Sequence, residues 1–535
     1  MADQVLLGDE AVALGAVHGG ISAAYAYPGT PSTEITEYLL KYAQTHPEIK
    51  AAWCSNEKTA LEEALGVSLV GKRVLVSMKH VGLNVAADPF MNAALLDIKG
   101  GLVIAVADDP GMHSSQNEQD SRYYADFARI ICLEPVNQQQ AYEMTREAFD
   151  ISEKYHIPVL LRLTTRLAHS RAVVTLADPR EQNSLGKSDN PKGWMLLPAY
   201  ARMRWADLVE RQKDLKKFTE DCPYSELTLN KDFKDYGVIT TGLGSNYFME
   251  NSEDFETIPS HLHIGAYPVP LEKIRRLAEN VEKLILIEEG YPFVERYLKG
   301  YLDPGIPVAG KESGDIPATG ELNPDNIRKA LGLKKKTGAP KTALELPNRP
   351  PQLCGGCPHA DTYFALNEAL RESGESLVTS DIGCYALGAL PPYESIETIV
   401  CMGASISMAK GAAEAGQKHV VAVIGDSTFL HSGITPLVDS VTANVPVTVL
   451  ILDNEIVAMT GGQQTILPSS KLEPLIRGIG VDKAHIRTIV PLKKNFDENV
   501  KVIREEVEYP GISVILSCRE CIESAKRRRR EASHG

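Results

Sequence analysis

Short runs of β-branched and aliphatic residues recur along the chain, and amphipathic stretches of helical length separate them. Each run ends in a polar loop that contains glycine, which is the pattern of a parallel sheet with helical crossovers. The first predicted strands span residues 21–27, 74–78, 102–107 and 158–163. We therefore expect a doubly wound sheet over residues 1–190, with Thr30 and Pro31 starting the helix after the first strand.

After residue 190 the pattern changes, which indicates further domains. A smaller α/β unit is expected at 236–310, with strands at 237–244, 261–266 and 284–288. The remaining segments are a connection at 191–235 with an amphipathic helix at 207–217, a Gly-, Pro- and Lys-rich linker at 311–350, a third unit at 351–520, and a solvated, mobile basic tail at 521–535.

The third unit contains the clearest candidate site. Residues 420–424 and 447–452 predict two neighbouring parallel strands joined by a helix. Asp426 follows the first strand and Asn454 follows the second, so their side chains are expected at the same edge of the sheet, where open α/β sheets bind ligands. A carboxylate and an amide oxygen suit Mg²⁺, which takes its other ligands from water and substrate phosphates.

Composition narrows the class of protein. A chain of 535 residues is expected to hold about three domains. Its net charge of −14 argues against nucleic acid as a partner. The acidic start lacks the features of a signal peptide, and no apolar run reaches the ~18 residues that a membrane helix needs. We expect a cytoplasmic protein that binds no membrane.

The sequence Gly425-Asp426-Ser427, followed at a distance by Asp453-Asn454, resembles the thiamine diphosphate signature. The resemblance implies that Asp426, Asn454 and the backbone carbonyl of Ile456 hold Mg²⁺ on the diphosphate, with Gly425, Ser427 and Gly403 beside the cofactor. Ser427 departs from the usual glycine at its position. Taken singly, each segment is also what an ordinary strand-end turn or loop contains.

Four further motifs resemble one family, the α (large) subunit of indolepyruvate ferredoxin oxidoreductase, within the 2-oxoacid:ferredoxin oxidoreductases. They lie at residues 27–34, 55–58, 78–84 and 108–118, and the similarity extends over nearly the whole chain. The resemblance implies an α/β fold with two thiamine diphosphate-binding, doubly wound domains. The first binds the pyrimidine, the third binds the diphosphate, and a smaller transketolase C-terminal-like domain lies between them in sequence.

Glu57 matches the acid of this family that hydrogen-bonds the cofactor's pyrimidine ring. It opens a helix whose next apolar residues indicate a packed environment, although a glutamate there is more often a partner of the helix dipole. The resemblance also implies that Thr30 faces the substrate carboxylate and that His113 lines the oxoacid pocket. Lys79, His80 and Asn84 are expected near the cofactor. Caps and loop hydrogen bonds are the simpler alternative for this group.

Six of the nine cysteines crowd the last third of the chain, which suggests a metal centre. The order of Cys354, Cys357, Cys384 and Cys521 resembles that of the ligands of the cofactor-proximal [4Fe–4S] cluster in 2-oxoacid oxidoreductases, with Cys518 as a substitute for the fourth. Such a cluster gives the electrons of an oxidative decarboxylation a one-electron exit. A zinc site and plain loop thiols are the alternatives. Cys401 is expected in the core.

The favoured function is the catalytic subunit of a 2-oxoacid oxidoreductase that converts an aryl pyruvate to the aryl-acetyl-CoA, with coenzyme A as co-substrate. The chain stops at Gly535 without the cysteine quartets of the family's C-terminal ferredoxin-like domain. Electrons are therefore expected to pass to ferredoxin or another carrier subunit. The family further implies a smaller β subunit and a dimer of heterodimers. A non-oxidative decarboxylase and a zinc-bearing scaffold without catalysis are the rival hypotheses.

Overall fold

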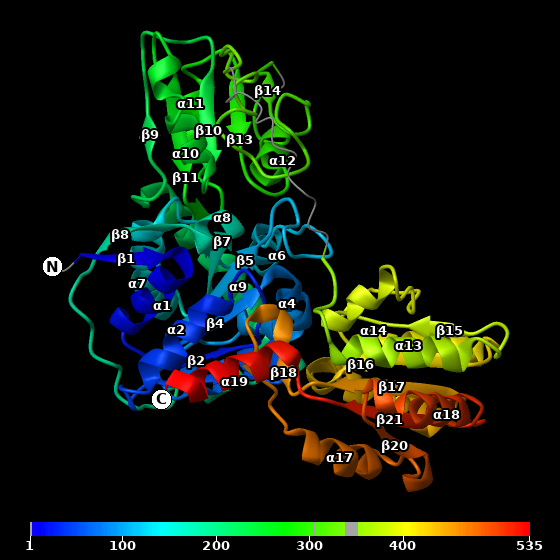
Figure 1. Cartoon of the computed structure of the whole chain (residues 1–535). Coiled ribbons are helices and arrows are strands. Elements are labelled where there is room, and N and C mark those ends of the chain that lie inside the picture. Colours follow the sequence, from blue (N-terminus) through cyan, green and yellow to red (C-terminus); the bar gives the residue numbers. More distant parts are fainter. Residues whose placement is uncertain (1–2, 304, 337–350, 535) are drawn as a thin grey trace. The chain divides into compact units, whose positions relative to one another are not determined.

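A computed structural model describes residues 3–303, 305–336 and 351–534. The chain forms two compact units, Met1–Pro340 and Lys341–Gly535, which are described separately below (Figure 1). Within the described ranges, the structure has no helix with the length and apolar character needed to cross a bilayer.

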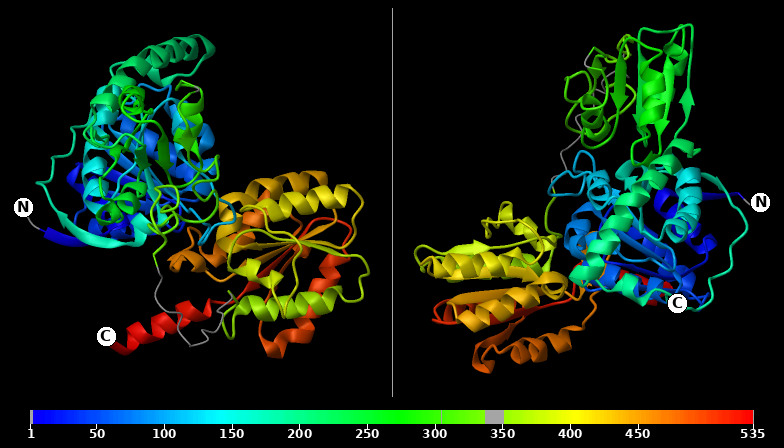
Figure 2. Two further views of the ribbon diagram at one scale, coloured as in Figure 1. Left: turned by 90° about the horizontal axis from the view of Figure 1, so that it is seen from above. Right: turned by 180° about the vertical axis from the view of Figure 1, so that it is seen from behind.

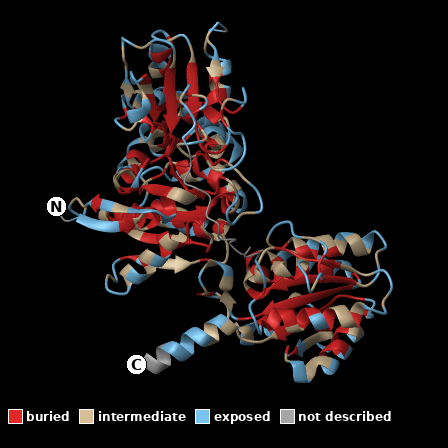
Figure 3. Ribbon diagram, turned by 45° about the horizontal axis from the view of Figure 1, so that its top comes forward, coloured by how far each residue is buried: buried red, intermediate tan, exposed pale blue. Residues whose placement is uncertain are grey.

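The first unit is built around a seven-stranded sheet in the order β12-β6-β7-β5-β4-β2-β3. All its strand pairs are parallel except that of β12 with β6, which confirms the predicted doubly wound fold. Its strands are β2 (Ile21–Ala26), β3 (Lys50–Trp53), β4 (Arg73–Lys79), β5 (Leu102–Asp108), β6 (Ile131–Leu133), β7 (Val159–Thr164) and β12 (Ala266–Tyr267). The central strands β4, β5 and β7 are buried along their whole length (Figure 3), as strands covered on both faces must be.

Helices and one small ribbon surround this sheet. The helices are α1 (Gly8–His18), α2 (Thr33–Ala43), α3 (Glu57–Leu69), α4 (His80–Val85), α5 (Ala87–Ala93), α6 (Arg122–Ala128), α7 (Gln138–Tyr155) and α8 (Thr165–His169). The strands β1 (Asp3–Leu7) and β8 (Arg171–Thr175) pair with each other in an antiparallel ribbon.

The predicted start of α2, with Thr30 as the cap and Pro31 as the first helical residue, is wrong, because the helix begins two residues later, with Ser32 at the cap position and Thr33 first. Residues 29–32 form a turn instead. The hydroxyl of Ser32 donates to the Gly29 carbonyl at 2.8 Å, and the Gly29 N–H donates to the hydroxyl of Thr33 at 3.0 Å. These local hydrogen bonds compete with helical ones and leave Thr30 in the loop.

A second α/β region of the same unit has a five-stranded sheet in the order β14-β13-β10-β11-β9. Its elements are β9 (Leu227–Thr228), β10 (Gly237–Thr241), β11 (Ser260–Ile264), β13 (Leu284–Ile287), β14 (Val308–Ala309), α10 (Gly244–Met249), α11 (Leu271–Ala278) and α12 (Phe293–Lys299). The single strand predicted at 261–266 is wrong at its end. Ala266 and Tyr267 form β12, which pairs with β6 of the first sheet.

The segments on either side of this region differ in length and burial from their predictions. The amphipathic helix expected at 207–217 is α9 (Pro198–Asp221), longer at both ends. Residues 311–336, assigned to a linker by composition, form turns that contribute Ile316, Leu322 and Ile327 to the core of the unit. Residues 337–350 of the same prediction lie outside the described residues.

Buried ion pairs join the two sheets of the first unit. Arg122 donates to Glu288 at 3.0 Å, and Arg162, which is paired with Asp108 of its own sheet at 2.6 Å, donates to the Glu289 carbonyl oxygen at 3.3 Å. Both guanidinium groups are fully buried, so each charge is stable only because carboxylates surround it. This network connects the loop after β5 with the loop after β13.

The second unit is a five-stranded parallel sheet in the order β15-β16-β17-β21-β20, with helices on both faces (Figure 2). Along β16, Val421 and Val423 pack with α13 and α18, whereas Val420 and Ala422 pack with α14, α16 and α17. The elements are β15 (Leu377–Thr379), β16 (Val420–Gly425), β17 (Val447–Asp453), β20 (Ile486–Ile489), β21 (Ser513–Cys518), α13 (Pro358–Leu370), α14 (Ala404–Glu414), α15 (Asp426–Thr428), α16 (Ile434–Ala443), α17 (Leu472–Ile479) and α18 (Phe496–Val507).

The basic tail is α19 (Ile522–His534), a helix rather than an unstructured end. Most of its described side chains are exposed, in agreement with the solvated character that was predicted (Figure 3). Arg527 donates hydrogen bonds to the carbonyl oxygens of Gly461 and Gly462, at 3.3 and 3.2 Å. The helix is thereby attached to the short ribbon of β18 (Ile456–Val457) and β19 (Gln463–Gln464).

Candidate active site

The predicted magnesium ligands lie together at the carboxyl edge of the second unit's sheet. In the parallel register of β16 and β17, Gly425 lies opposite Leu452, so Asp426, the residue after β16, lies beside Asp453, the last residue of β17. The Asp426 carboxylate accepts from the Glu455 N–H at 2.8 Å, and the Asn454 side-chain oxygen accepts from the Ile456 N–H at 3.2 Å. The two loops therefore form one oxygen-rich corner.

The charges at this corner fit a divalent cation. Asp426 and Asp453 are both buried, and one oxygen of Asp453 has no hydrogen-bond partner in the part of the chain that the structure describes. Burial, together with the neighbouring Asp453, raises the pKa of the Asp426 carboxyl to about 8. A cation neutralises such a pair of carboxylates. Asp453 is a functional candidate that sequence reasoning missed.

Two positions of the predicted cofactor loops, Gly403 and Ser427, differ in whether the backbone requires glycine. Gly403 has a φ of 87°, and a Cβ there would meet the Ser432 carbonyl oxygen at 2.5 Å, so only glycine fits. Ser427 lies inside the short helix α15, a conformation that any residue adopts. The departure from glycine at Ser427 therefore costs no strain.

Asp381 organises the Gly403 loop and was not predicted as a site residue. Its carboxylate accepts from the Gly403 N–H at 3.1 Å and from the Ser405 hydroxyl at 2.7 Å. Burial raises the pKa of Asp381 to about 6, against the effect of these hydrogen bonds. Tyr385 donates to the same carboxylate, and its ring lies where a Cβ of Gly425 would be, at 2.6 Å. One tyrosine thus packs the turn after Cys384 against the turn before Asp426.

Four cysteines line one cavity of about 470 Å³ in the second unit, namely Cys354, Cys357, Cys384 and Cys521. His359, Asn454 and Ile456 line it as well. The cysteine turns therefore share one pocket with two of the three predicted magnesium ligands, whereas Asp426 is not among the residues that line it.

The other two cysteines of this region lie elsewhere. The Cys518 thiol donates to Asp453 at 3.5 Å, outside the residues that line the cavity. Cys401 is exposed, so its predicted place in the core is wrong, because the loop before Gly403 lies at the surface.

The spacing of the sulfurs bears on the metal. Among the described residues, no three cysteine sulfurs lie within 4.8 Å of one another. In a tetrahedral zinc site, with bonds of about 2.3 Å, neighbouring sulfurs are about 3.8 Å apart. The thiols are therefore not arranged as a tetrahedral zinc site, and four thiols that line one cavity are the ligand set of a [4Fe–4S] cluster.

His359 connects the cysteine loop with Asn454. Burial lowers the pKa of His359 to about 4, so its ring is neutral near pH 7. The imidazole Nε2 lies 3.2 Å from the side-chain nitrogen of Asn454, which donates to it. This bond turns the Asn454 oxygen away from the imidazole. His359 lies two residues after Cys357, and nothing in the sequence indicates this role.

In the first unit, the loops after β2, β4 and β5 converge at the carboxyl edge of the sheet. Lys79 donates to the Ser114 carbonyl oxygen at 2.8 Å, and the Ser114 hydroxyl donates to that of Thr30 at 3.4 Å. His80 contacts the Asn117 carbonyl at 3.2 Å. Burial lowers the pKa of Lys79 to about 8, against the opposing effect of Asp109. Thr30, Lys79 and His80 are therefore brought together.

Glu57 lies at the same edge, as the first residue of α3, and its side chain is buried. Asn56 caps the helix by accepting from the Thr59 N–H at 2.8 Å. A Cβ on Gly82 of α4 would lie 2.4 Å from a Glu57 carboxylate oxygen, so the absent side chain makes room for the acid. Gly82 is a further residue to which the sequence analysis assigned no role.

Asn84 and His113 lie further out. Asn84 is exposed and accepts from the Tyr124 hydroxyl at 2.6 Å. With His80 it lines a cavity of about 360 Å³ that also contains Arg296. The ring of His113 is about half exposed and lies 3.5 Å from the Glu321 carboxylate.

Two family profiles match the chain. The one described as pyruvate flavodoxin/ferredoxin oxidoreductase, thiamine diP-binding, matches residues 14–206. The one described as thiamine pyrophosphate enzyme, C-terminal TPP binding domain, matches residues 381–513.

Full-length relatives are similar over nearly all of the chain. Indolepyruvate oxidoreductase subunit IorA of Archaeoglobus fulgidus is 35% identical, over 98% of this chain and 88% of that protein. The subunit of the same name from Methanothermobacter marburgensis is 37% identical, over 97% of this chain and 86% of its own length.

A solved structure of 2-oxoglutarate:ferredoxin oxidoreductase from Magnetococcus marinus, with 2-oxoglutarate, coenzyme A and succinyl-CoA bound, has a TM-score of 0.51. It is 16% identical and covers 62% of this chain and 65% of its own, a likeness of fold.

Proposed function

Since this chain belongs to the family of indolepyruvate oxidoreductase subunit IorA, a family of thiamine diphosphate-dependent 2-oxoacid oxidoreductases, we propose that it is the catalytic subunit that converts an aryl pyruvate, such as indolepyruvate, to the aryl-acetyl-CoA. The oxoacid and the coenzyme A thiol give the thioester, CO₂, one proton and two electrons. Two equivalents of a one-electron carrier of the ferredoxin class take up the electrons. The names and near-complete coverage of the relatives support this substrate class.

Thiamine diphosphate, when bound, supplies the carbon nucleophile and the electron sink for decarboxylation. Asp426, Asn454 and the Ile456 carbonyl hold Mg²⁺ on its diphosphate, and the loops of Gly403, Gly425 and Ser427 surround the phosphates. The observation that supports this assignment is the pair of buried carboxylates, Asp426 and Asp453, at the carboxyl edge of a parallel sheet.

In the first unit, Glu57 gives the acid that hydrogen-bonds the pyrimidine. It is buried, and α4 packs against its carboxylate through Gly82. Thr30 and His113 face the oxoacid, and Lys79, His80 and Asn84 border the cofactor. The contacts of Ser114 with Lys79 and Thr30 support the grouping of these loops, because they hold three strand ends in one place.

Cys354, Cys357, Cys384 and Cys521 bind a [4Fe–4S] cluster, which accepts and releases one electron at a time. The single observation that carries the oxidative reading is that these four thiols line the same cavity as Asn454 and Ile456. A decarboxylase that releases an aldehyde has no use for thiols at that place. A smaller β subunit, in a dimer of heterodimers, and ferredoxin or another carrier subunit are the proposed partners.

Product analysis tests the proposal. Anaerobically purified complex is given indolepyruvate, thiamine diphosphate, Mg²⁺, coenzyme A and a one-electron dye. The proposal predicts indole-acetyl-CoA and two reduced dye molecules for each CO₂ released. Indole-acetaldehyde without dye reduction would instead identify a non-oxidative decarboxylase.

A further inference from the structure

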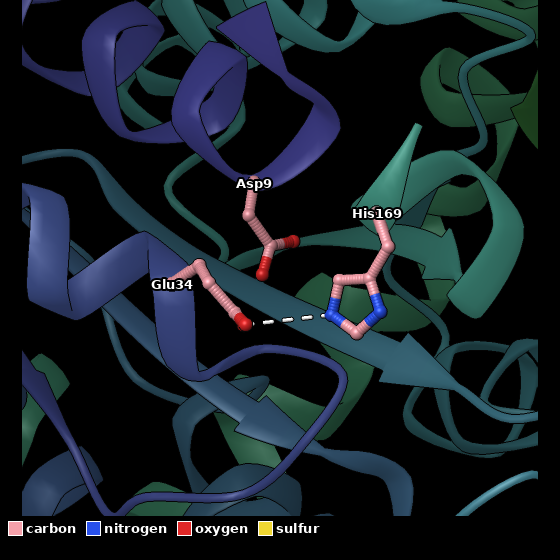
Figure 4. Close-up of side chains that lie close together, drawn as sticks. All are labelled: Asp9, Glu34 and His169. Carbon is pink, nitrogen blue, oxygen red and sulfur yellow. Dashed lines mark ion pairs between the residues drawn. The ribbon is translucent and has the colours of Figure 1, made fainter. Parts of the chain in front are cut away.

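Three side chains from separate elements of the first unit converge outside the loops described above (Figure 4). Asp9 lies at the start of α1, Glu34 in the first turn of α2, and His169 at the end of α8. One ligand atom from each lies within 4.8 Å of the other two, and the Glu34 carboxylate is 3.5 Å from the His169 Nε2. Figure 4 shows the three side chains directed towards one another.

The backbone places Asp9 and His169 together. In the ribbon of β1 and β8, Leu7 pairs with Arg171, and the Gly8 N–H donates to the Ser170 carbonyl at 3.2 Å. A Cβ on Gly8 would lie 2.1 Å from the Leu167 carbonyl oxygen, so only glycine permits this approach of α1 to α8. The close approach of α1 to α8 therefore depends on the glycine at position 8.

The burial of the Asp9 carboxylate is not explained by a contact within the protein. Asp9 is 0% exposed, and neither of its carboxylate oxygens receives a hydrogen bond from an N–H or hydroxyl group in the described part of the chain. Burial and the neighbouring Glu34 carboxylate, to which a protonated Asp9 can donate, raise the pKa of Asp9. The capping role at this helix start belongs to Glu10, which accepts from the Leu7 N–H at 2.8 Å. A buried carboxylate without a partner is costly, and a second carboxylate beside it adds to that cost. The arrangement therefore calls for a positive charge between the two acids.

We propose that Asp9, Glu34 and His169 bind one divalent transition-metal cation. Two carboxylate oxygens and one imidazole nitrogen suit Mn²⁺, Fe²⁺, Co²⁺ or Zn²⁺ better than Mg²⁺ or Ca²⁺, which prefer oxygen ligands alone. With bonds of 2.0–2.2 Å, ligand atoms around one ion are about 3–4.4 Å apart, in keeping with the observed spacing. The side chains of Glu34 and His169 are 36% and 34% exposed, which leaves a side open for water ligands and ion entry.

The ion has a positioning role. Glu34 stands four residues after Thr30, just beyond the turn at residues 29–32. An ion that links Glu34 to α1 and α8 fixes the start of α2, and with it the loop that carries Thr30. The three residues of this site belong to the first unit, whereas the four candidate cluster cysteines and Asp426 belong to the second.

Mn²⁺ is the probe that tests this site, because it avoids thiolates and reports its nitrogen ligands in pulsed electron paramagnetic resonance. The full-length protein is stripped with chelator and supplied with Mg²⁺ and thiamine diphosphate, so that the diphosphate site is filled. We expect one Mn²⁺ per chain, a rise in melting temperature, and an imidazole nitrogen coupling. Asp9→Asn and His169→Gln should each weaken Mn²⁺ binding at least ~100-fold, and His46→Gln, a change at a distant histidine, should not.

Asp9→Asn separates this proposal from a carboxyl kept neutral by a proton. The amide preserves the shape and removes a buried charge, so the metal-free variant is expected to fold with unchanged or greater stability. The proposal predicts that Mn²⁺ no longer raises its melting temperature. If the wild-type chain binds no Mn²⁺ under these conditions, or if both variants bind it as tightly as the wild type, the metal site is refuted.

Discussion

The backbone N–H of Cys521 donates a hydrogen bond to the carbonyl oxygen of Asn454, at 3.3 Å. These residues follow β21 and β17, which are neighbours in the second unit's sheet. The contact joins a predicted cluster ligand to a predicted magnesium ligand through the backbone alone. A change in the cysteine loop is therefore expected to reach the diphosphate end of the site.

His359→Leu is expected to weaken Mg²⁺ binding at saturating thiamine diphosphate by about 10–100-fold, the usual effect of removing a residue that orients a metal ligand. The leucine leaves the Asn454 amide without its acceptor, so the asparagine side chain is free to rotate. The measurement is the half-saturating Mg²⁺ concentration for cofactor binding. His359→Gln retains an acceptor and should recover most of the affinity. Equal losses in the two variants would show that packing alone is at work.

Serine substitutions distinguish the fourth cluster ligand. Cys384→Ser and Cys521→Ser should lower the iron and sulfide content of anaerobically purified protein to near zero, because a cluster of this type needs all four thiolates. Cys518→Ser and Cys401→Ser should leave the content unchanged, since one thiol contacts Asp453 and the other is exposed. Loss of iron in Cys518→Ser but not in Cys521→Ser would identify Cys518, and not Cys521, as the fourth ligand.

Gly82→Ala is expected to reduce kcat about 100-fold, because its methyl group displaces the Glu57 carboxylate, and a misplacement of about 1 Å has an effect of that size. Gly66→Ala is the matched control. Gly66 lies in α3, the helix that Glu57 opens, and a Cβ there meets no atom within 4 Å. That variant should keep full activity. Similar kinetics for the two alanine variants would remove Glu57 from the site.

The raised pKa of Asp426 predicts coupling between Mg²⁺ and protons. In the metal-free chain, Asp426 has a pKa of about 8 in the folded state and 3.8 in the unfolded state. Between these two pH values the folded state holds a proton that the unfolded state has already released. The free energy of unfolding should therefore fall as pH rises through that range. Mg²⁺ binding at pH 7 should release about one proton, as calorimetry in buffers of different ionisation enthalpy measures.

Asp453→Asn removes the neighbouring charge and should reduce that proton release, whereas Asp439→Asn, at an exposed acid, should not. Proton release that is the same in the wild type and both variants would show that Asp453 does not raise the pKa of Asp426.

The sequence predicts well wherever a local pattern decides the structure. Parallel strands such as β16 and β17 are buried on both faces, so they read as continuous apolar runs whose ends are easily located. The positions of Asp426 and Asn454 follow directly from those ends. The grouping of four cysteines around one cavity is instead what the resemblance of their order to the family's cluster ligands implies.

Features that depend on distant contacts could not be predicted. Nothing near Gly82 indicates that its missing side chain makes room for Glu57, and nothing near His359 indicates a bond to Asn454, 95 residues away. Ala266 and Tyr267 do not continue β11 but form β12, which pairs with the edge strand β6 of the first sheet. The turn before α2 was missed because the hydroxyls of Ser32 and Thr33 favour local hydrogen bonds over the first helical turn.

The most direct test of the central claim, that a thiamine site and a cysteine-bound cluster work as one redox unit, is the visible absorption of the anaerobically purified complex. The account predicts about four irons per chain and an absorption that indolepyruvate bleaches in the presence of thiamine diphosphate, Mg²⁺ and coenzyme A. Glu57→Gln should hold the same iron but stay unbleached. A colourless wild-type protein, or bleaching that persists in Glu57→Gln, would contradict it.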